Sequence, residues 1–543
     1  MNNMESIEIK ESPAYRMKQK KDRYEMHKYW GKKPSNDLYH LISKYSSEGD
    51  ILLDPFAGYG VFCCEAYIMQ RNIVCNDLNP ISNFIQEQLL SKNVDFDKLD
   101  AEFNLIVQRL SSYVADWYKI KENTDMVAIT VLRDSKDEII KCKYKVRNAT
   151  KFKEYEFTKK ERELFKKKER DFQLDEWIPN IDLIENSRIS AKERMAIKDI
   201  FTKRTMACHS MLYKLVNDIS SGSEKRLLLL AFTSNLANCS KLVPPIKSRG
   251  DMTPGAWMTG FYWGETYLEN NVLHYFKNRY NKVIKGKKDY LSCFNTIFHF
   301  MGLSDIGKVD DILQFSKSTY GYLTKNEDAR SISLPSESID YIFTDPPYGD
   351  SVPYFEQSII WNSWLKLNPE YDNEIVVSNS PLRQKNIIAY RNDIEKAISE
   401  IFRVLKKNKY FSITFHSLSG SEWNCLTNAC IKAGFEIHDL VWLTQKTFTP
   451  RQLNRGKSVK GDVLITLIKP SLKKSFNKYN KNDTINYFEG LLDTIISGRQ
   501  VETNEIFMKV VKEIFDNSII LADVNFFEIL NSRFNFTENK WSK

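Results

Sequence analysis

Several kinds of residue and segment are scarce or missing in this chain of 543 residues. It has nine cysteines, an odd number, and no Cys-x-x-Cys pair. This argues against a zinc cluster and favours a reducing compartment. The longest apolar run, Leu227 to Phe232, is far too short to span a bilayer. The first six residues include no basic stretch before an apolar one, so we expect no secretory signal, no membrane partner and a cytoplasmic location.

Two further absences narrow the function. There is no Gly-x-x-x-x-Gly-Lys-Ser/Thr sequence, because the Gly-Lys-Ser at 456–458 has arginine rather than glycine five positions before its glycine; the usual triphosphate-binding loop is therefore not expected. No internal repeat is visible, so a solenoid is excluded. The composition, with 27% charged and 42% hydrophobic residues, is that of a globular protein. A chain of this length should hold more than one domain.

A nucleotide-binding pattern lies near the start. The apolar run Ile51 to Leu53 ends in Asp54, and Gly58 and Gly60 then lead into a helical pattern. Glycines at a strand-to-helix turn let the backbone approach a ligand closely. The next predicted strand, 72–77, ends in Asp77, an acid suited to ribose hydroxyls.

A second pattern, Thr344-Asp-Pro-Pro-Tyr-Gly349, follows a short apolar run. Proline cannot donate to a sheet ladder, so Pro346 and Pro347 end the strand. The resulting lip carries an anion, backbone acceptors and one aromatic ring, which suits a planar base with an exocyclic amine. A plain strand followed by a proline turn is the alternative from these residues alone.

Together these segments resemble the S-adenosylmethionine-dependent DNA amino-methyltransferases, which modify adenine N6 or cytosine N4. The matching pieces are Asp54 to Gly60, Asp77 to Pro80 and Thr344 to Tyr348, with His27 to Pro34 similar to the first cofactor segment of the family. The resemblance implies an α/β fold, a Rossmann-like methyltransferase sheet, with S-adenosylmethionine as the cofactor and no metal. The resemblance is clear over about 1–90 and 325–470 and weak over the residues between these two ranges.

The resemblance also implies roles for individual residues. The catalytic set for the target base is Asp345, Pro346, Pro347 and Tyr348, with Tyr348 stacking on a base flipped out of the duplex. The cofactor-binding set is Tyr29, Trp30, Lys32, Pro34, Asp54, Pro55, Phe56, Gly58, Gly60, Asp77, Leu78 and Asp328.

The spacing of the two patterns predicts four regions. Residues 1–95 would form the cofactor-binding half, 96–320 a large, mainly helical inserted target-recognition domain, 321–470 the catalytic half, and 471–543 a small helical module. Residues 469–483 would be the linker that leads to the helices of this module. Within the insertion, 126–133 and 139–146 predict a β-hairpin, 159–170 a charged helix, and 191–218 and 224–238 amphipathic helices. His416 ends a predicted strand, where a packed histidine is more common than a catalytic one.

Basic residues are concentrated in one stretch of the insertion. Lys141 to Arg170 contains thirteen Lys and Arg residues against five Glu, a net charge of +8 in a chain whose net charge is +9. Such a run is either a solvated face or a surface that lies along phosphates. The resemblance favours phosphates, and so double-stranded DNA as the partner.

The sequence therefore predicts a site-specific adenine-N6 DNA methyltransferase of a restriction-modification or other defence or epigenetic system. A cytosine-N4 DNA methyltransferase is the alternative. A second alternative is an RNA guanine-N2 methyltransferase, because members of that group resemble the chain at Asp345 to Gly349. A third is a protein that binds nucleic acid without a cofactor. A restriction endonuclease would be a possible partner, and the oligomeric state cannot be derived from the sequence.

Overall fold

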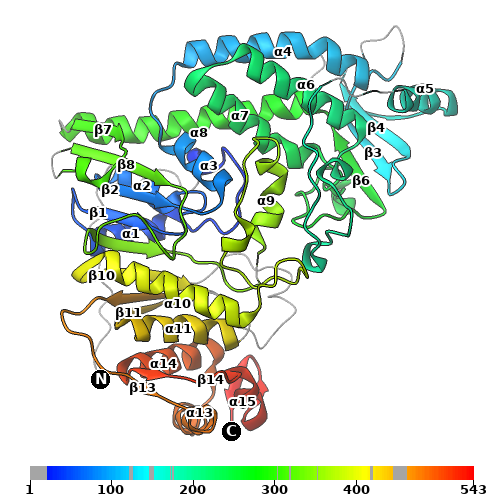
Figure 1. Cartoon of the computed structure of the whole chain (residues 1–543). Coiled ribbons are helices and arrows are strands. Elements are labelled where there is room, and N and C mark those ends of the chain that lie inside the picture. Colours follow the sequence, from blue (N-terminus) through cyan, green and yellow to red (C-terminus); the bar gives the residue numbers. More distant parts are fainter. Residues whose placement is uncertain are drawn as a thin grey trace.

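The computed structural model describes residues 21–121, 126–145, 152–171, 173, 176–301, 304–316, 319–350, 352–415, 420–443 and 462–543. Figure 1 shows a central sheet with helices on both faces. The insertion, cyan and green, lies on one side of this sheet, and the C-terminal module, orange and red, lies on the other.

The central sheet has eight strands in the order β11-β12-β10-β9-β1-β2-β8-β7. Neighbouring strands are parallel, except that β12 runs antiparallel to both β10 and β11. The strands are β1 Ile51–Asp54, β2 Asn72–Asn76, β7 Ser304–Lys308, β8 Thr319–Lys325, β9 Ile339–Thr344, β10 Leu405–Phe415, β11 Glu436–Leu443 and β12 Asp462–Ile468. The predicted Rossmann-like α/β fold is confirmed.

Helices cover both faces of the sheet. Leu52 packs in one buried cluster, with residues of α1 (Ser35–Tyr45), α2 (Val61–Ile68), α3 (Pro80–Leu90) and the insertion. Leu53, which points to the other face, packs in a second cluster with α10 (Ile387–Val404), α11 (Gly420–Ala433) and the C-terminal module. Side chains alternate between the faces of a strand, and both faces are buried here, so these strands are nearly continuously apolar.

Strand order reverses between β1 and β9. From β1 the chain moves to β2 on one side, whereas β9 pairs with the other side of β1, with Leu52 opposite Tyr341. In open α/β sheets ligands bind beyond the carboxyl ends of the strands at such a switch point. Asp54 and Asp345 therefore meet at this edge, although 291 positions separate them in the sequence.

The insertion combines helices with a small antiparallel sheet of order β5-β4-β3-β6. Its long helix α8 runs back to the central sheet (Figure 1), and Lys287 on it donates to the carbonyls of Gln88 and Leu89 at the end of α3, at 2.6 and 3.3 Å. The elements are α4 Phe96–Tyr118, β3 Val127–Asp134, β4 Ile139–Lys145, β5 Lys153–Glu156, α5 Lys159–Arg170, α6 Lys203–Ile219, α7 Gly222–Leu236, β6 Thr266–Asn270 and α8 Val272–Met301. Helix α9 (Tyr354–Asn362) follows the catalytic lip.

The C-terminal module packs directly on the central domain. Trp423 of α11 contacts the rings of Phe488, Phe507 and Phe526. The module consists of α13 Lys481–Ile496, α14 Thr503–Asp516 and α15 Phe526–Arg533, with the short strands β13 Asn477–Lys478, β14 Val501–Glu502, β15 Ile519–Ile520, β16 Asn535–Thr537 and β17 Lys540–Ser542.

Several local predictions can now be compared with the structure. The hairpin in the insertion is confirmed as β3 and β4, and the charged helix as α5. The helix expected from residue 191 begins only at Lys203, because 191–202 form short turns and bridges. Residues 304–320, assigned to the insertion, supply β7 and the start of β8 to the central sheet. The expected linker at 469–483 is wrong in part, since β13 and the start of α13 lie within it.

No helix in the described ranges is both long and apolar enough to cross a membrane.

Candidate active site

A cavity with about 110 Å³ of space for the centres of water molecules lies at the carboxyl edge of the central sheet. Its walls come from three regions that are distant in sequence: 29–33 with 54–62, the ends of β2 and β8, and the lip after β9 with the loop at 373–375. Of the predicted residues it is lined by Tyr29, Trp30, Lys32, Asp54, Pro55, Phe56, Gly58, Asp77, Leu78, Asp328, Asp345 and Pro347. Carboxylates and aromatic rings thus line one concave site, as is common for sites that bind small organic ligands.

The glycine turn and Asp77 form one wall. Gly58 has φ +50°, and a Cβ there would lie 3.1 Å from the Tyr29 ring, so only glycine fits without strain. The Gly58 N–H donates to Asp77 Oδ2 at 2.7 Å, and the Asn79 N–H to Oδ1 at 2.8 Å. Burial raises the pKa of Asp77 to about 6, against these hydrogen bonds, which lower it. Each carboxylate oxygen keeps a lone pair for a ligand hydroxyl.

Asp54 is 5% exposed at the end of β1. Its Oδ1 accepts hydrogen bonds from the Phe56 N–H at 3.1 Å and the Thr344 hydroxyl at 3.0 Å. Burial raises the pKa of Asp54 to about 8. A bound cation would favour the ionised carboxylate, so this end of the cavity suits a positively charged ligand atom.

Asp345 projects from the lip that follows β9. Its Oδ1 accepts from the Thr414 hydroxyl at 2.7 Å and from the Tyr348 hydroxyl, and it lies 3.1 Å from the Lys33 ammonium. No donor to Oδ2 is found in the part of the chain that the structure describes. A Cβ on Gly31 would lie 3.9 Å from that oxygen. One oxygen of Asp345 is therefore held, and the other is available to a ligand.

The residues of the lip that follow Asp345 are held by contacts within the protein. The Tyr348 hydroxyl also donates to the Thr414 carbonyl at 3.1 Å, and its ring packs edge-on against Phe415 at 5.4 Å. Pro346 is buried, and the Pro347 carbonyl accepts from the Tyr390 hydroxyl at 2.8 Å. Neither Tyr348 nor Pro346 lines the cavity.

The segment 29–34 closes the cavity from the N-terminal side. Tyr29 stacks on Tyr354, with ring centroids 6.1 Å apart, and Trp30 packs against Trp361 at 5.1 Å and Trp257 at 6.2 Å. Trp257 belongs to the aromatic 257–264 stretch of the insertion, so the insertion supports this wall.

The lysines of this segment point in different directions. Lys32 donates to the carbonyls of Tyr24 and His27, both at 2.7 Å, and so its ammonium is engaged by the backbone rather than by Asp345. Lys33 is the lysine that contacts Asp345. Pro34 precedes α1 and lines a second, neighbouring cavity, and Gly60, at φ +86°, caps α2.

Several lining residues were missed by the sequence analysis. Tyr354, Asn373, Glu374 and Ile375 line the cavity but belong to no motif. Glu374 is held by Arg383, whose two ends donate to Glu374 at 2.7 Å and Glu356 at 2.6 Å. Burial, with the neighbouring Glu356, raises the pKa of Glu374 to about 8. Lys33 and Thr414 were also missed, although both lie in segments that the sequence analysis singled out, the first in His27 to Pro34 and the second in the strand before His416.

Asp328 lines the cavity after β8, as expected for a residue near an adenine ring, but its carboxylate is also paired with Arg330. His416 and the basic stretch 446–460, which the sequence also suggests for DNA contacts, lie outside the described residues.

The residues present fit S-adenosylmethionine. The glycine turn leaves space that a Cβ would occupy, Asp77 offers acceptors to two hydroxyls, and the Tyr29 and Phe56 rings provide apolar walls. Asp54, which lines the same cavity, would balance the positive charge of the sulfonium.

Comparison with protein families supports the same identification. The N6_N4_Mtase family model, described as DNA methylase, matches residues 8–85. This range contains the segments around Tyr29, Asp54, Gly58 and Asp77. A search of curated proteins found no match.

Similarities to solved structures are weak. An S-adenosylmethionine-dependent methyltransferase from Methanosarcina mazei shares 15% identity over 29% of this chain and 72% of that one, with a TM-score of 0.17. A candidate DNA modification methylase from Thermus thermophilus, complexed with S-adenosyl-L-methionine, shares 15% over 27% of this chain, which spans about half (53%) of that one, also at 0.17. An rRNA methyltransferase from Streptomyces viridochromogenes shares 7% over 80% and 83%, at 0.23.

TM-scores of this size carry no argument about either fold or function. The fold therefore rests on the strand order, and the function on the residues of the site and the family match. Through residues 8–85, which hold the cofactor wall of the cavity, the chain is similar to the DNA methylases, and S-adenosylmethionine is the cofactor that goes with that family.

Proposed function

We propose that this protein transfers a methyl group from S-adenosylmethionine to adenine N6 of a base flipped out of double-stranded DNA. One observation carries the proposal. Asp345, at the end of β9, faces the same cavity as Asp54 and Asp77, at the ends of β1 and β2, and one of its oxygens has no donor in the described part of the chain. A cofactor site and an acceptor for an amine thus share one cavity.

The residues would divide the work as follows. Asp77 binds the ribose hydroxyls, the Gly58 turn allows close approach of the backbone, and Asp54 lies toward the charged sulfur. The cofactor supplies an electrophilic methyl group. Asp345 Oδ2 accepts a hydrogen bond from the target amine and holds its nitrogen in position. Positioning of this kind supplies much of the rate in a transfer that needs no other catalyst.

The amine acceptor favours a base edge as the target. An exocyclic amine inside a duplex is paired and stacked, so the base must leave the helix to reach the cavity. Tyr348 is engaged by Asp345 and Phe415. Its ring does not line the cavity, so stacking on the base, as the resemblance implies, requires the ring to move toward the cavity.

Adenine N6 is proposed ahead of cytosine N4 because Asp, rather than Ser, precedes Pro346, Pro347 and Tyr348, which is a preference within the family. RNA guanine N2 is less favoured, because the family model that matches residues 8–85 is described as DNA methylase. A modification role in a restriction or other defence system is proposed on the same resemblance.

Helix α5 is the proposed contact for DNA phosphates. Lys159, Lys160 and Lys167 on it are exposed, and no ion pair to them is found within the described ranges. Lys166 and Lys168, in contrast, are paired with Glu138 and Asp116. The net positive charge of the stretch is therefore partly neutralised, and the unpaired lysines carry the proposal.

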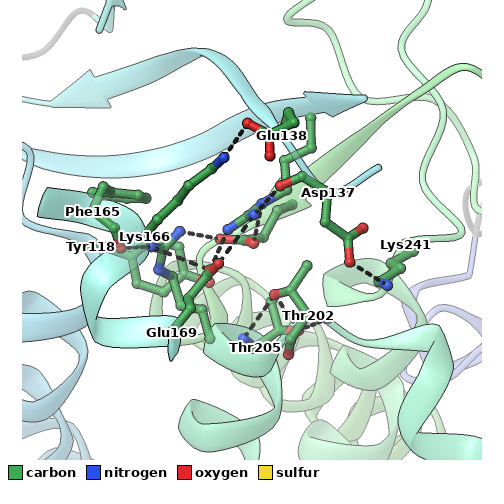
Figure 2. Close-up of polar contacts among 12 residues, drawn as sticks. Tyr118, Asp137, Glu138, Phe165, Lys166, Glu169, Thr202, Thr205 and Lys241 are labelled. Atoms are coloured by element: carbon green, nitrogen blue, oxygen red, sulfur yellow. Dashed lines mark hydrogen bonds and ion pairs between the residues drawn. The ribbon is translucent and has the colours of Figure 1, made fainter. Parts of the chain in front are cut away.

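A buried ion network holds α5 in place. Figure 2 shows Glu169 and Phe165 of α5 facing the interior beside Tyr118, with Lys166 reaching Glu138 at the surface. Glu169 pairs with Arg133 of β3 and lies 3.4 Å from Arg204 of α6. The guanidinium of Arg204 lies 3.6 Å from the centre of the Phe165 ring. A rigid helix presents its lysines without the entropy cost of ordering a loop on binding.

The product tests the proposal. The protein would be incubated with unmethylated plasmid DNA and S-adenosylmethionine, and the digested nucleosides would be identified by mass spectrometry. We expect N6-methyladenine. N4-methylcytosine alone would move the assignment to the cytosine alternative, and labelling of RNA without DNA would reject the substrate class. Sequencing of the modified DNA would then give the recognition sequence.

A further inference from the structure

Lys33 lies between two carboxylates at the wall of the cavity. Its ammonium is 3.1 Å from Asp345 Oδ1 and 2.7 Å from Asp462 Oδ2, and the side chains of all three residues are largely buried, at 15%, 19% and 10% exposure. Asp462 is the first residue of β12. The three residues thus come from the N-terminal segment, the catalytic lip and the far side of the sheet.

Within the described residues, every hydrogen bond and ion pair to Asp345 falls on one oxygen. The hydroxyls of Tyr348 and Thr414 donate to Oδ1, and the Lys33 ammonium lies beside the same atom. A half-turn of the carboxylate exchanges two equivalent oxygens, so these contacts fix the plane of the carboxylate, and rotation out of that plane would weaken all three together. All three contacts are strengthened by the charge of the carboxylate, and of the three partners Lys33 alone also brings a positive charge.

We propose that Lys33 is a positioning residue for methyl transfer, which fixes Asp345 so that Oδ2 faces the target amine, with Asp462 holding Lys33 in turn. The inference rests on the proposed function and deepens it. Lys33 touches neither the base nor the transferred methyl group in this role. It belongs to the same segment as Tyr29 and Trp30, so the wall of the cofactor cavity also orients the catalytic carboxylate.

The inference distinguishes Lys33 from its neighbour. Lys32 has its ammonium on two backbone carbonyls and its charge over the Tyr59 ring, 3.7 Å from the centroid. The two lysines are adjacent in sequence, but only Lys33 reaches the lip.

Four variants test the inference, on unmethylated DNA with wild type assayed in parallel. Lys33→Ala and Lys33→Met should lower kcat by about 10- to 100-fold, as for misplacement of a reacting group by a fraction of a bond length. The cofactor Kd, from calorimetry, should stay within about threefold, since Oδ1 is not a cofactor ligand. Lys33→Arg, which keeps the charge, should retain more activity than either, and Asp462→Asn should lose less than Lys33→Ala.

Lys406→Ala is the matched control. Lys406 pairs with Asp340 at 2.9 Å, and Asp340 lies on the same strand, β9, toward the end opposite the lip. Loss of the Lys406 side chain should leave kcat unchanged within about twofold, although the substitution also removes a Lys–Asp ion pair.

A second measurement does not depend on activity. The denaturation midpoints of Lys33→Ala, Asp462→Asn and the double variant form a cycle, and an ion pair between these residues makes the double variant lose less than the sum of the single losses. Additive losses would overturn the geometry on which the inference depends.

The remaining outcomes separate the inference from the proposed function. Normal kcat in Lys33→Ala, with an active wild type, overturns the inference alone. A cofactor Kd weakened tenfold at unchanged kcat would make Lys33 a cofactor ligand and also overturn it. A wild type that methylates no DNA rejects the proposed function, and the inference with it.

Discussion

At the scale of single residues, three carboxylates share the cavity and differ in which of their oxygens are already hydrogen-bonded. Burial raises the pKa of Asp54. Asp77 accepts hydrogen bonds from the backbone through both oxygens, whereas Asp345 is held by one oxygen only. Their sequence positions alone, each at the end of an apolar run, placed all three at one edge of the sheet. Which oxygen is held, and by which donors, depends on packing across the sheet and could not be derived from the motif.

Asp345→Ala is expected to remove methyl transfer while leaving cofactor binding nearly intact. The side chain that accepts from the amine is lost, and the removal of a preorganised acceptor from a transition state costs on the order of 10²-fold or more. Turnover of labelled methyl groups into DNA checks the loss, and calorimetry checks the affinity for S-adenosylmethionine. Asp345→Asn, which keeps the shape but not the charge, provides the comparison, and near-normal turnover in Asp345→Ala would remove this residue from the site.

The second expectation concerns pH. Burial raises the pKa of Asp77 to about 6, so its carboxylate is ionised above that pH and protonated below it. A ribose hydroxyl donates to the ionised form, and we therefore expect the cofactor affinity to rise as the pH increases from about 5 to about 7. Calorimetry over this range would show the rise in wild type and a flat response in Asp77→Asn. The same change of cofactor affinity with pH in both proteins would show that Asp77 does not control binding. Asp54, whose pKa burial raises to about 8, changes its protonation above this pH range.

At the scale of elements, the strands and helices that surround the site were readable from periodicity. The helix after the lip, α9, buries Trp361, and Trp364 is buried just beyond its end. The β3–β4 hairpin and α5 were also found where predicted. The break before α6 was not, because hydrogen bonds among the turns of 191–202 override a local pattern that is typical of a helix.

Helix α5 gives the prediction for DNA. Lys159→Gln, Lys160→Gln and Lys167→Gln together should weaken binding across sequences and flatten the log–log salt dependence by about 0.9 for each phosphate that is no longer neutralised. Base preference should persist, because a lysine on a phosphate positions the duplex without reading it. Salt titrations on DNA of random sequence measure the slope. The paired lysines, changed as Lys166→Gln and Lys168→Gln, should have a smaller effect, and an equal slope in the first variant would identify α5 as a solvated surface.

At the scale of the whole molecule, the domain boundaries were the least readable feature. Residues 304–320 looked like part of the insertion, but β7 and the first residues of β8 join the central sheet. The cause is the topology. The chain reaches β7 and β8 only after the insertion, because the long helix α8 leads from the insertion back to the central sheet (Figure 1). Local patterns do not show which sheet a strand will join, because pairing is decided by neighbours that are distant in sequence.

The C-terminal module gives the last prediction. Its helices enclose Trp423 of α11 together with Phe488, Phe507 and Phe526, and the Asn428 side chain bonds both the carbonyl and the N–H of Leu521 across the interface, at 2.8 and 3.0 Å. The module and the central domain therefore share one hydrophobic core. Deletion of residues 471–543 would expose that core to water, and each large side chain uncovered costs about 2–3 kcal/mol.

We expect the shortened chain, residues 1–470, to be insoluble or to unfold without a cooperative transition. The full chain should not show a separate transition for the module in calorimetry. Leu472→Ser, in the exposed connection at 85% exposure, controls for a change in this segment that leaves the core intact and should not move the midpoint. A soluble 1–470 chain with an unchanged midpoint and full cofactor affinity would mean that the module is a separate domain. The aromatic packing around Trp423 argues against that result, because the three phenylalanine rings on the module side would be gone.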